Sequence, residues 1–249
     1  MKKIKYSGMR STIGEFIHLA SRINPPFICI EADARWLMKF CSQHRLSYTS
    51  VLLKIIAEVQ KKYPIMNAIM ARDIIRKKIF LPDSVDIAIA MEKRYQGENF
   101  VAIPTIRSVN TKSIETIASE INHLSNLSYE DMPDIKPVIG FHRFPDFLKY
   151  WLLKLICQNA KVYNFFFGTI GFTNLGKYGV THFYPLWIHA TVFGIGTIEE
   201  KPVVRNGQIT AAPMLHITIA FNHRILDGSV ASEILAEMKR SIEDEKYYK

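Results

Sequence analysis

One histidine near the carboxyl end of the chain stands where proton-transfer chemistry could occur. The stretch Ala-Phe-Asn-His-Arg-Ile-Leu-Asp-Gly-Ser covers residues 220–229 and places His223 shortly before Asp227 and Gly228. An imidazole suits general acid–base catalysis because its pKa lies near neutral pH. A polar turn without a catalytic role is the alternative, because Asp-Gly is also a common turn dipeptide.

The flanking segments predict a strand and a helix that would hold this histidine in place. Apolar and polar residues alternate over 215–222, which is the period of a strand with one face in a core. Residues 230–240 show helical spacing instead. Asp227 and Ser229 carry short oxygen-bearing side chains that could cap the first turn of that helix. We therefore expect His223 at a strand end, beside a tight turn.

The spacing His223-x-x-x-Asp227-Gly228 resembles the His-x-x-x-Asp-Gly signature of the chloramphenicol acetyltransferase-like superfamily. The closest branch is the catalytic domain of the dihydrolipoamide acyltransferases of 2-oxoacid dehydrogenase complexes. That branch commonly has Asp before the histidine, where this chain has Asn222. The resemblance implies an α/β protein with a two-layer CoA-dependent acyltransferase-like fold, in which helices cover a mixed β-sheet.

Two further segments carry the resemblance. Thr173-Asn-Leu-Gly176 resembles the Ser/Thr-x-Leu-Gly segment of the family, whose hydroxyl faces the thioester carbonyl. Arg10 stands where the branch opens its first helix with an arginine that pairs with the Asp of the motif. The implied catalytic set is His223 as general base, Thr173 as oxyanion donor and an Arg10–Asp227 ion pair that holds the turn. Taken alone, Thr173 also fits an ordinary strand, and Arg10 a solvated surface.

The resemblance also implies the reaction and its partners. The family moves an acyl group from a coenzyme A thioester to a thiol or hydroxyl, without a covalent enzyme intermediate. Its active site lies between subunits of a trimer, so we expect a homotrimer or a larger trimer-based assembly. The acceptor would be a small molecule or a lipoyl group. A non-catalytic trimeric scaffold that retains the fold is the rival interpretation.

The remaining patterns predict the elements of one catalytic domain over residues 1–249. Strands are expected at residues 27–33, 86–91, 100–106 and 192–198, and Asn206-Gly207 predicts a hairpin before the strand that leads to the histidine. Helices are expected at residues 13–23, 35–44, 47–63 and 113–124. No segment resembles a lipoyl domain or a peripheral-subunit-binding domain, which predicts a free-standing acyltransferase or one whose lipoyl partner is encoded separately.

The resemblance fails between residues 131 and 167, which we interpret as an atypical apolar helical insertion. Residues 147–156 combine helical spacing with interspersed charges, which predicts an amphipathic helix. Such a helix would pack on the core or on a neighbouring subunit. A lid, an acyl-chain pocket and a peripheral membrane contact are the other interpretations.

Composition narrows the class of protein further. The chain has 249 residues and a formal net charge of +9, which suits nucleic acid, an anionic membrane or coenzyme A. Its basic residues are scattered and no zinc-finger or RNP-like pattern is present, so we expect no nucleic-acid partner. Three unspaced cysteines favour a reducing cytoplasm. The histidines lack His-x-x-x-His spacing, which predicts no metal site.

Overall fold

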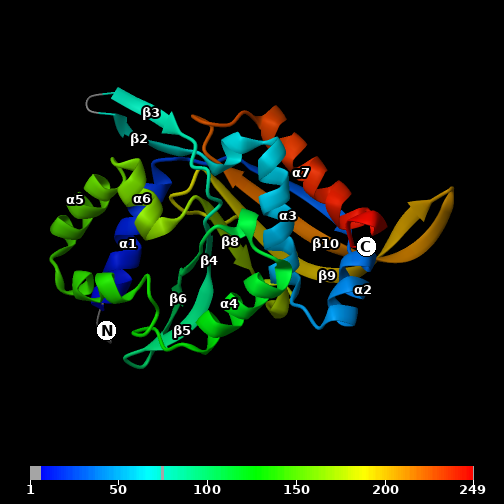
Figure 1. The fold of residues 1–249 in the computed structure, drawn as a ribbon, viewed down its shortest axis with the longest axis horizontal. Helices are drawn as coiled ribbons and strands as arrows, with labels where there is room; N and C mark the ends of the chain where they lie inside the picture. Colours follow the sequence, from blue (N-terminus) through cyan, green and yellow to red (C-terminus); the bar gives the residue numbers. More distant parts are fainter. Residues whose placement is uncertain (1–6, 74–75, 249) are drawn as a thin grey trace, which may run out of the picture.

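The computed structural model describes residues 7–73 and 76–248, and its centre is a six-stranded mixed β-sheet (Figure 1). The strands lie in the order β1-β10-β9-β8-β4-β7. β8 is parallel to β9 and β4, and the other neighbours are antiparallel. Their bounds are β1 Phe27–Asp33, β4 Ile87–Ile89, β7 Thr105–Ile106, β8 Ile170–Asn174, β9 Thr191–Arg205 and β10 Gln208–Phe221. The predicted α/β fold with a mixed sheet is confirmed.

One layer of helices covers the sheet and encloses the main core. It comprises α2 Arg35–His44, α3 Tyr48–Lys62, α4 Ile114–Asn126 and α7 Gly228–Glu243. Figure 1 shows α3 and α7 crossing in front of the long strands. Ser47 caps α3 by accepting the backbone N–H of Ser50 at 3.2 Å. Fully buried Ile55 packs in one core cluster with Ile217 of β10 and Ile234 of α7, and each such burial stabilises the fold by about 1.5–3 kcal/mol.

A second group of elements stands beside this core. It contains α1 Gly8–Ser21, η3 Lys136–Arg143, α5 Asp146–Ile156 and α6 Ala160–Phe167, with the hairpins β2–β3 (Ile69–Asp73 and Arg76–Phe80) and β5–β6 (Met91–Tyr95 and Glu98–Ala102). Lys149 of α5 is 1% exposed, and its ammonium donates to the Gly8 carbonyl at 3.2 Å and to Ser11 Oγ at 2.7 Å. A buried ammonium must be paired to be tolerated. These bonds therefore tie α5 to the start of α1.

The outward face of α5 is apolar. Phe147, Trp151 and Leu155 recur every four residues and are 70%, 59% and 63% exposed. The predicted amphipathic helix is therefore present, although its largest side chains are not covered by the rest of this chain. Among the described residues, no helix has the length and apolarity to cross a bilayer.

Several expected elements are confirmed, and others differ for local reasons. The hairpin at Asn206-Gly207 forms with φ of 50° and 78°, the left-handed values that a two-residue turn of this type requires. Expected strands 86–91 and 100–106 each divide into two, because residues 91–102 leave the main sheet as the β5–β6 hairpin. The β2–β3 hairpin was not predicted. Every residue of β10 from 214 to 221 is buried, so both of its faces are covered, whereas the alternation in the sequence predicted only one buried face.

Candidate active site

The turn that carries His223 is held by Asn222, which directly follows β10. Asn222 is 5% exposed, and its backbone N–H donates to the Ala190 carbonyl at 2.8 Å. Its Oδ1 accepts from the backbone N–H of Arg224 at 3.1 Å and from the Nε–H of the same residue at 3.2 Å. Asn222 thus fixes the backbone on both sides of the histidine. A neutral amide here supplies the acceptor oxygen that this turn needs.

His223 is presented at the surface of the chain. Its side chain is 60% exposed, and its Nδ1 lies 3.5 Å from Oδ1 of Asp227. Asp227 occupies the N-cap position of α7, but its carboxylate makes no capping hydrogen bond to the first turn. The side-chain cap that the sequence suggested is therefore absent, because this carboxylate faces the imidazole. Nε2 is then the nitrogen available to exchange a proton with a substrate.

The predicted ion pair between Arg10 and Asp227 is wrong for this chain. Arg10 Nε lies 3.6 Å from Oε2 of Glu98, and Ser7, the cap of α1, donates to the same carboxylate at 2.9 Å. The cause is the position of α1, which packs on α5 and η3 rather than beside the start of α7. Asp227 has His223 as its ionic neighbour instead.

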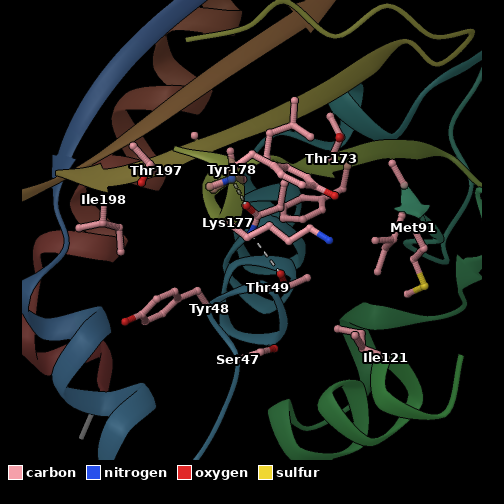
Figure 2. Close-up of a pocket in the computed structure, with 18 of the residues that line it drawn as sticks. Ser47, Tyr48, Thr49, Met91, Ile121, Thr173, Lys177, Tyr178, Thr197 and Ile198 are labelled. Atoms are coloured by element: carbon pink, nitrogen blue, oxygen red, sulfur yellow. Dashed lines mark hydrogen bonds between the residues drawn. The ribbon is translucent and has the colours of Figure 1, made fainter. Parts of the chain in front are cut away.

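Thr173, at the end of β8, lines a large open cavity. The cavity has a volume of about 1490 Å³, above the roughly 300–1,000 Å³ of ordinary small-molecule pockets. Figure 2 shows side chains from several elements around it, including α3, β5 and the turn after β8. Those labelled there include Ser47, Thr49, Met91, Ile121, Thr173, Lys177 and Tyr178. A space of this size can hold a large ligand.

The Asn-Leu-Gly segment after Thr173 also lines this cavity, and local contacts hold its backbone in place. Asn174 accepts the backbone N–H of Gly176 at 2.9 Å and donates to Oγ1 of Thr49 at 3.3 Å. A Cβ at Gly176 would lie 2.7 Å from the Gly196 carbonyl oxygen, so only glycine fits there. The Thr173 hydroxyl is half-buried and has no hydrogen-bond partner within residues 7–73 and 76–248. It is therefore a donor available to a ligand.

Charged side chains line one side of the same cavity. Lys177 Nζ lies 3.5 Å from Oε2 of Glu92, and the Tyr178 hydroxyl donates to this carboxylate. The bond from Tyr178 and the nearby ammonium of Lys177 lower the pKa of Glu92. Lys93 donates to three carbonyls at the end of α4, and burial lowers the pKa of this ammonium. Lys177 is 65% exposed despite its ion pair with Glu92, so its ammonium is accessible to an anionic ligand.

His223 and Thr173 do not meet within one chain. Thr173 pairs with Gly194 across β8–β9, whereas Phe221, two residues before His223, pairs with Thr191 across β9–β10. The offset along the strands and across the sheet separates the two side chains by roughly 15 Å or more, from a rise of about 3.3 Å per residue and a spacing of about 4.8 Å between strands. His223 also does not line the Thr173 cavity.

Sequence reasoning missed several residues of this site. Thr49 at the start of α3 and Lys177-Tyr178 in η4 (Gly176–Tyr178) reach the cavity through tertiary packing. Only the Thr-Asn-Leu-Gly segment gave a local signal. Asn222 was noticed as a departure from the usual Asp, but its role in the turn follows from hydrogen bonds that the sequence does not reveal.

Comparison with known proteins decides the family. The sequence model of the 2-oxoacid dehydrogenases acyltransferase (catalytic domain) family matches residues 1–132 and 159–247. The chain belongs to this family. The unmatched residues 133–158 contain η3 and α5, and the match resumes just before α6. The resemblance inferred from the His-x-x-x-Asp-Gly and Thr-x-Leu-Gly segments is confirmed.

Individual relatives agree with the family assignment. The chain is 27% identical, over 96% of its length, to the dihydrolipoyllysine-residue acetyltransferase component of the pyruvate dehydrogenase complex of Bacillus subtilis. It spans about half the length of that relative. The cubic core of a pyruvate dehydrogenase multienzyme complex and the dihydrolipoamide acetyltransferase of Azotobacter vinelandii each superpose with a TM-score of 0.75 at 17% identity, over 100% of this chain and 93% of theirs. These two structures show the same fold.

Proposed function

We propose that this family member is a CoA-dependent acyltransferase that moves an acyl group between a coenzyme A thioester and a thiol or hydroxyl acceptor. One observation carries the proposal. The two side chains that the family resemblance assigns to catalysis are both accessible to a ligand. His223 stands on an exposed turn, and Thr173 lines a large cavity, where its hydroxyl has no hydrogen-bond partner among the described residues. The Azotobacter vinelandii relative was studied for the roles of a serine, a histidine and an asparagine in its catalytic mechanism. Thr173, His223 and Asp227 are the corresponding candidates here.

The proposed reaction needs a base and an oxyanion donor. His223 Nε2 takes the proton from the acceptor thiol or hydroxyl, and the resulting nucleophile attacks the carbonyl carbon of the thioester. The Thr173 hydroxyl donates to the oxyanion of the tetrahedral intermediate. Collapse breaks the carbon–sulfur bond, and the imidazolium returns its proton to the coenzyme A thiolate. The Asp227 carboxylate, 3.5 Å from Nδ1, steadies the imidazolium while it carries that proton.

The Thr173 cavity is suited to bind the proposed donor substrate, a coenzyme A thioester. Coenzyme A is long and polyanionic, and the 1490 Å³ space offers apolar walls with one exposed cation, Lys177. A thioester carbonyl placed at Thr173 would leave the rest of the molecule to run along the cavity past η4. We infer that Lys177 contacts a phosphate of the donor.

The separation of His223 from Thr173 within one chain supports an assembly of several copies of this chain. A catalytic base and an oxyanion donor must reach the same carbonyl within hydrogen-bond distance, and one chain does not bring them together. We therefore propose a homotrimer or a larger trimer-based assembly in which the histidine turn of one protomer enters the Thr173 cavity of its neighbour. The whole chain then acts as one catalytic domain of that assembly.

Two substitutions test the chemistry. His223→Ala should lower kcat for acyl transfer from acetyl-CoA to dihydrolipoamide by about 10²–10⁴-fold. Thr173→Val should lower it by about 10²–10³-fold, and Thr173→Ser should restore most of it. His123→Ala, at an exposed histidine of α4, is the matched control. Unchanged turnover in His223→Ala would refute the role of His223, whereas no turnover by the unmodified chain would favour a non-catalytic scaffold.

A second candidate function is favoured by one observation. The exposed stripe of Phe147, Trp151 and Leu155 lies on α5, within the segment that the family model leaves unmatched. Lys154 on the same helix lies 4.5 Å from the centre of the Trp151 ring. Aromatic residues beside lysine are typical of helices that lie on an anionic membrane surface. We propose that α5 gives the acyltransferase a peripheral membrane contact.

A further inference from the structure

A cluster of metal-ligating side chains lies outside the Thr173 cavity. Glu31, His182 and His216 each offer one ligand atom, and these atoms all lie within 4.8 Å of one another. Glu31 and His216 are paired directly across β1 and β10, so both side chains leave the same face of the sheet. None of the three has a role in the proposed acyl transfer.

The sheet is irregular at His216. A register shift in the β9–β10 pairing sets residues 196–197 of β9 opposite this single residue. Such bulges are frequent beside functional sites, where they re-aim a side chain. A Cβ at Gly196 would lie 3.0 Å from the Cβ of His216, so the bulge leaves no room for a larger residue.

The same bulge positions His182. The backbone N–H of Thr197 donates to the Val180 carbonyl at 2.8 Å. A Cβ at Gly196 would overlap the backbone of this segment, at 2.1 Å from its nearest carbonyl oxygen. The segment is thus clamped to β9, and the His182 ring centre lies 4.4 Å from that of His216.

The state of His216 is a second, independent indication of a ligand. The residue is 1% exposed, yet neither ring nitrogen has a hydrogen-bond partner within the described chain. Buried polar groups are normally paired. Nδ1 lies 3.4 Å from Oε1 of Glu31, and Nε2 lies 3.5 Å from Oε2 of Glu199.

We propose that Glu31, His182 and His216 bind a divalent transition-metal ion, for which Zn²⁺ is the best match. Zinc is bound by imidazole nitrogen and carboxylate oxygen at about 2.0–2.2 Å, so neighbouring ligands of a tetrahedral site are about 3.4 Å apart. Nδ1 of His216 and Oε1 of Glu31 have this separation. The Nε2–H of His216 then points toward the Glu199 carboxylate, which matches the carboxylate–histidine–zinc arrangement of known sites.

Lys201 is the group that competes with a metal ion. Its Nζ lies 2.7 Å from Oε1 of Glu31 and 3.8 Å from Oε2 of Glu199. The ammonium therefore balances the two carboxylates. Its flexible stem is 30% exposed, so it can leave when a divalent cation arrives. No pattern in the sequence indicated this site, because its ligands come from three distant segments.

A metal at this place would act on structure rather than on acyl transfer. It would fasten the segment after η4 to β1 and β10. That segment directly follows Lys177 and Tyr178 of η4, which line the Thr173 cavity. Bound metal should therefore raise the melting temperature of the chain whether or not the chain transfers acyl groups.

Two metal titrations of the tag-free, chelator-treated 249-residue chain test the site. Binding of Zn²⁺ is followed by calorimetry, and binding of Co²⁺ by visible absorption. We expect one equivalent per chain and a tetrahedral Co²⁺ spectrum. His182 is exposed, so His182→Ala should not disturb folding. This variant should weaken metal binding by more than about tenfold, because loss of an outer-shell partner alone already weakens metal affinity by about that factor. Glu199→Gln should weaken it by about tenfold, and Lys201→Met should strengthen it.

His123→Ala serves as the control for nonspecific binding to surface histidines, and it should bind like the unmodified chain. The proposal is overturned if the unmodified chain binds neither ion. It is also overturned if His182→Ala and His123→Ala bind equally well, because the metal would then sit elsewhere. Tighter metal binding by Lys201→Met would support the proposal, because an ion-pair cluster without a metal site would not produce it.

Discussion

At the scale of single residues, the catalytic role proposed for His223 depends on how firmly its turn is held. Asn222 is buried, and its Oδ1 accepts two hydrogen bonds from Arg224. Loss of this acceptor would leave the backbone N–H of Arg224 without its partner, at a cost of about 1–3 kcal/mol. It would also release the segment that positions the imidazole.

Substitution of Asn222 separates these effects. We expect Asn222→Ala to lower kcat by up to about 10²-fold, because a catalytic group displaced by about 1 Å loses rate on that scale, and to lower the melting temperature. Asn222→Asp keeps the acceptor oxygen and should remain close to the unmodified protein in both measurements. Steady-state kinetics and thermal unfolding check this. Full activity in Asn222→Ala would show that the turn holds without the amide.

The candidate residues that sequence reasoning could single out are those with a local signature, and their roles stay predictions. His223 and Thr173 each lie in a short motif whose backbone conformation is set by its own neighbours. The Arg10–Asp227 pair failed because it depends on where α1 packs, and α1 is anchored to α5 through the buried Lys149. His216 gave no signal at all, since its neighbours Glu31 and His182 are distant in the chain.

At the scale of elements, α5 lies in the segment that the family's sequence model does not match. Its inner face is fixed by Lys149 and by buried Leu153, whereas its outer face exposes an aromatic and aliphatic stripe. Hydrophobic periodicity predicted the helix because the spacing is local. Periodicity cannot tell which partner covers an apolar face, so the exposure of Phe147, Trp151 and Leu155 had to come from the structure.

The stripe makes the membrane contact testable. The unmodified chain should cosediment with vesicles of anionic phospholipid, and rising salt should weaken this binding. Phe147→Ser combined with Trp151→Ser should reduce the partition coefficient more than tenfold, because each large apolar side chain contributes about 1.5–3 kcal/mol when buried. Val204→Ser with Ile209→Ser, at exposed positions of the β9–β10 hairpin, is the matched control. Equal binding of both double variants would exclude α5 as the contact.

At the scale of the whole molecule, the sheet separates the two halves of the proposed site. β8 delivers Thr173 to the cavity, while β10 carries His223 to a different part of the surface. The strand order depends on the long β9–β10 hairpin, whose turn could be predicted from the sequence. It also depends on the parallel pairing of β8, which could not be predicted. The proposed site would therefore be completed by a neighbouring chain, which a cyclic assembly would supply at every interface.

Mixed assemblies distinguish a shared site from an internal one. Chains carrying His223→Ala and chains carrying Thr173→Val should each be nearly inactive alone. Coexpressed in equal amounts, they should form trimers in which about a quarter of the sites combine an intact histidine with an intact threonine from the next protomer. Acyl transfer should then recover to about a quarter of the unmodified rate. If each site were built within one chain, every site in the mixture would lack one group, and coexpression would restore nothing.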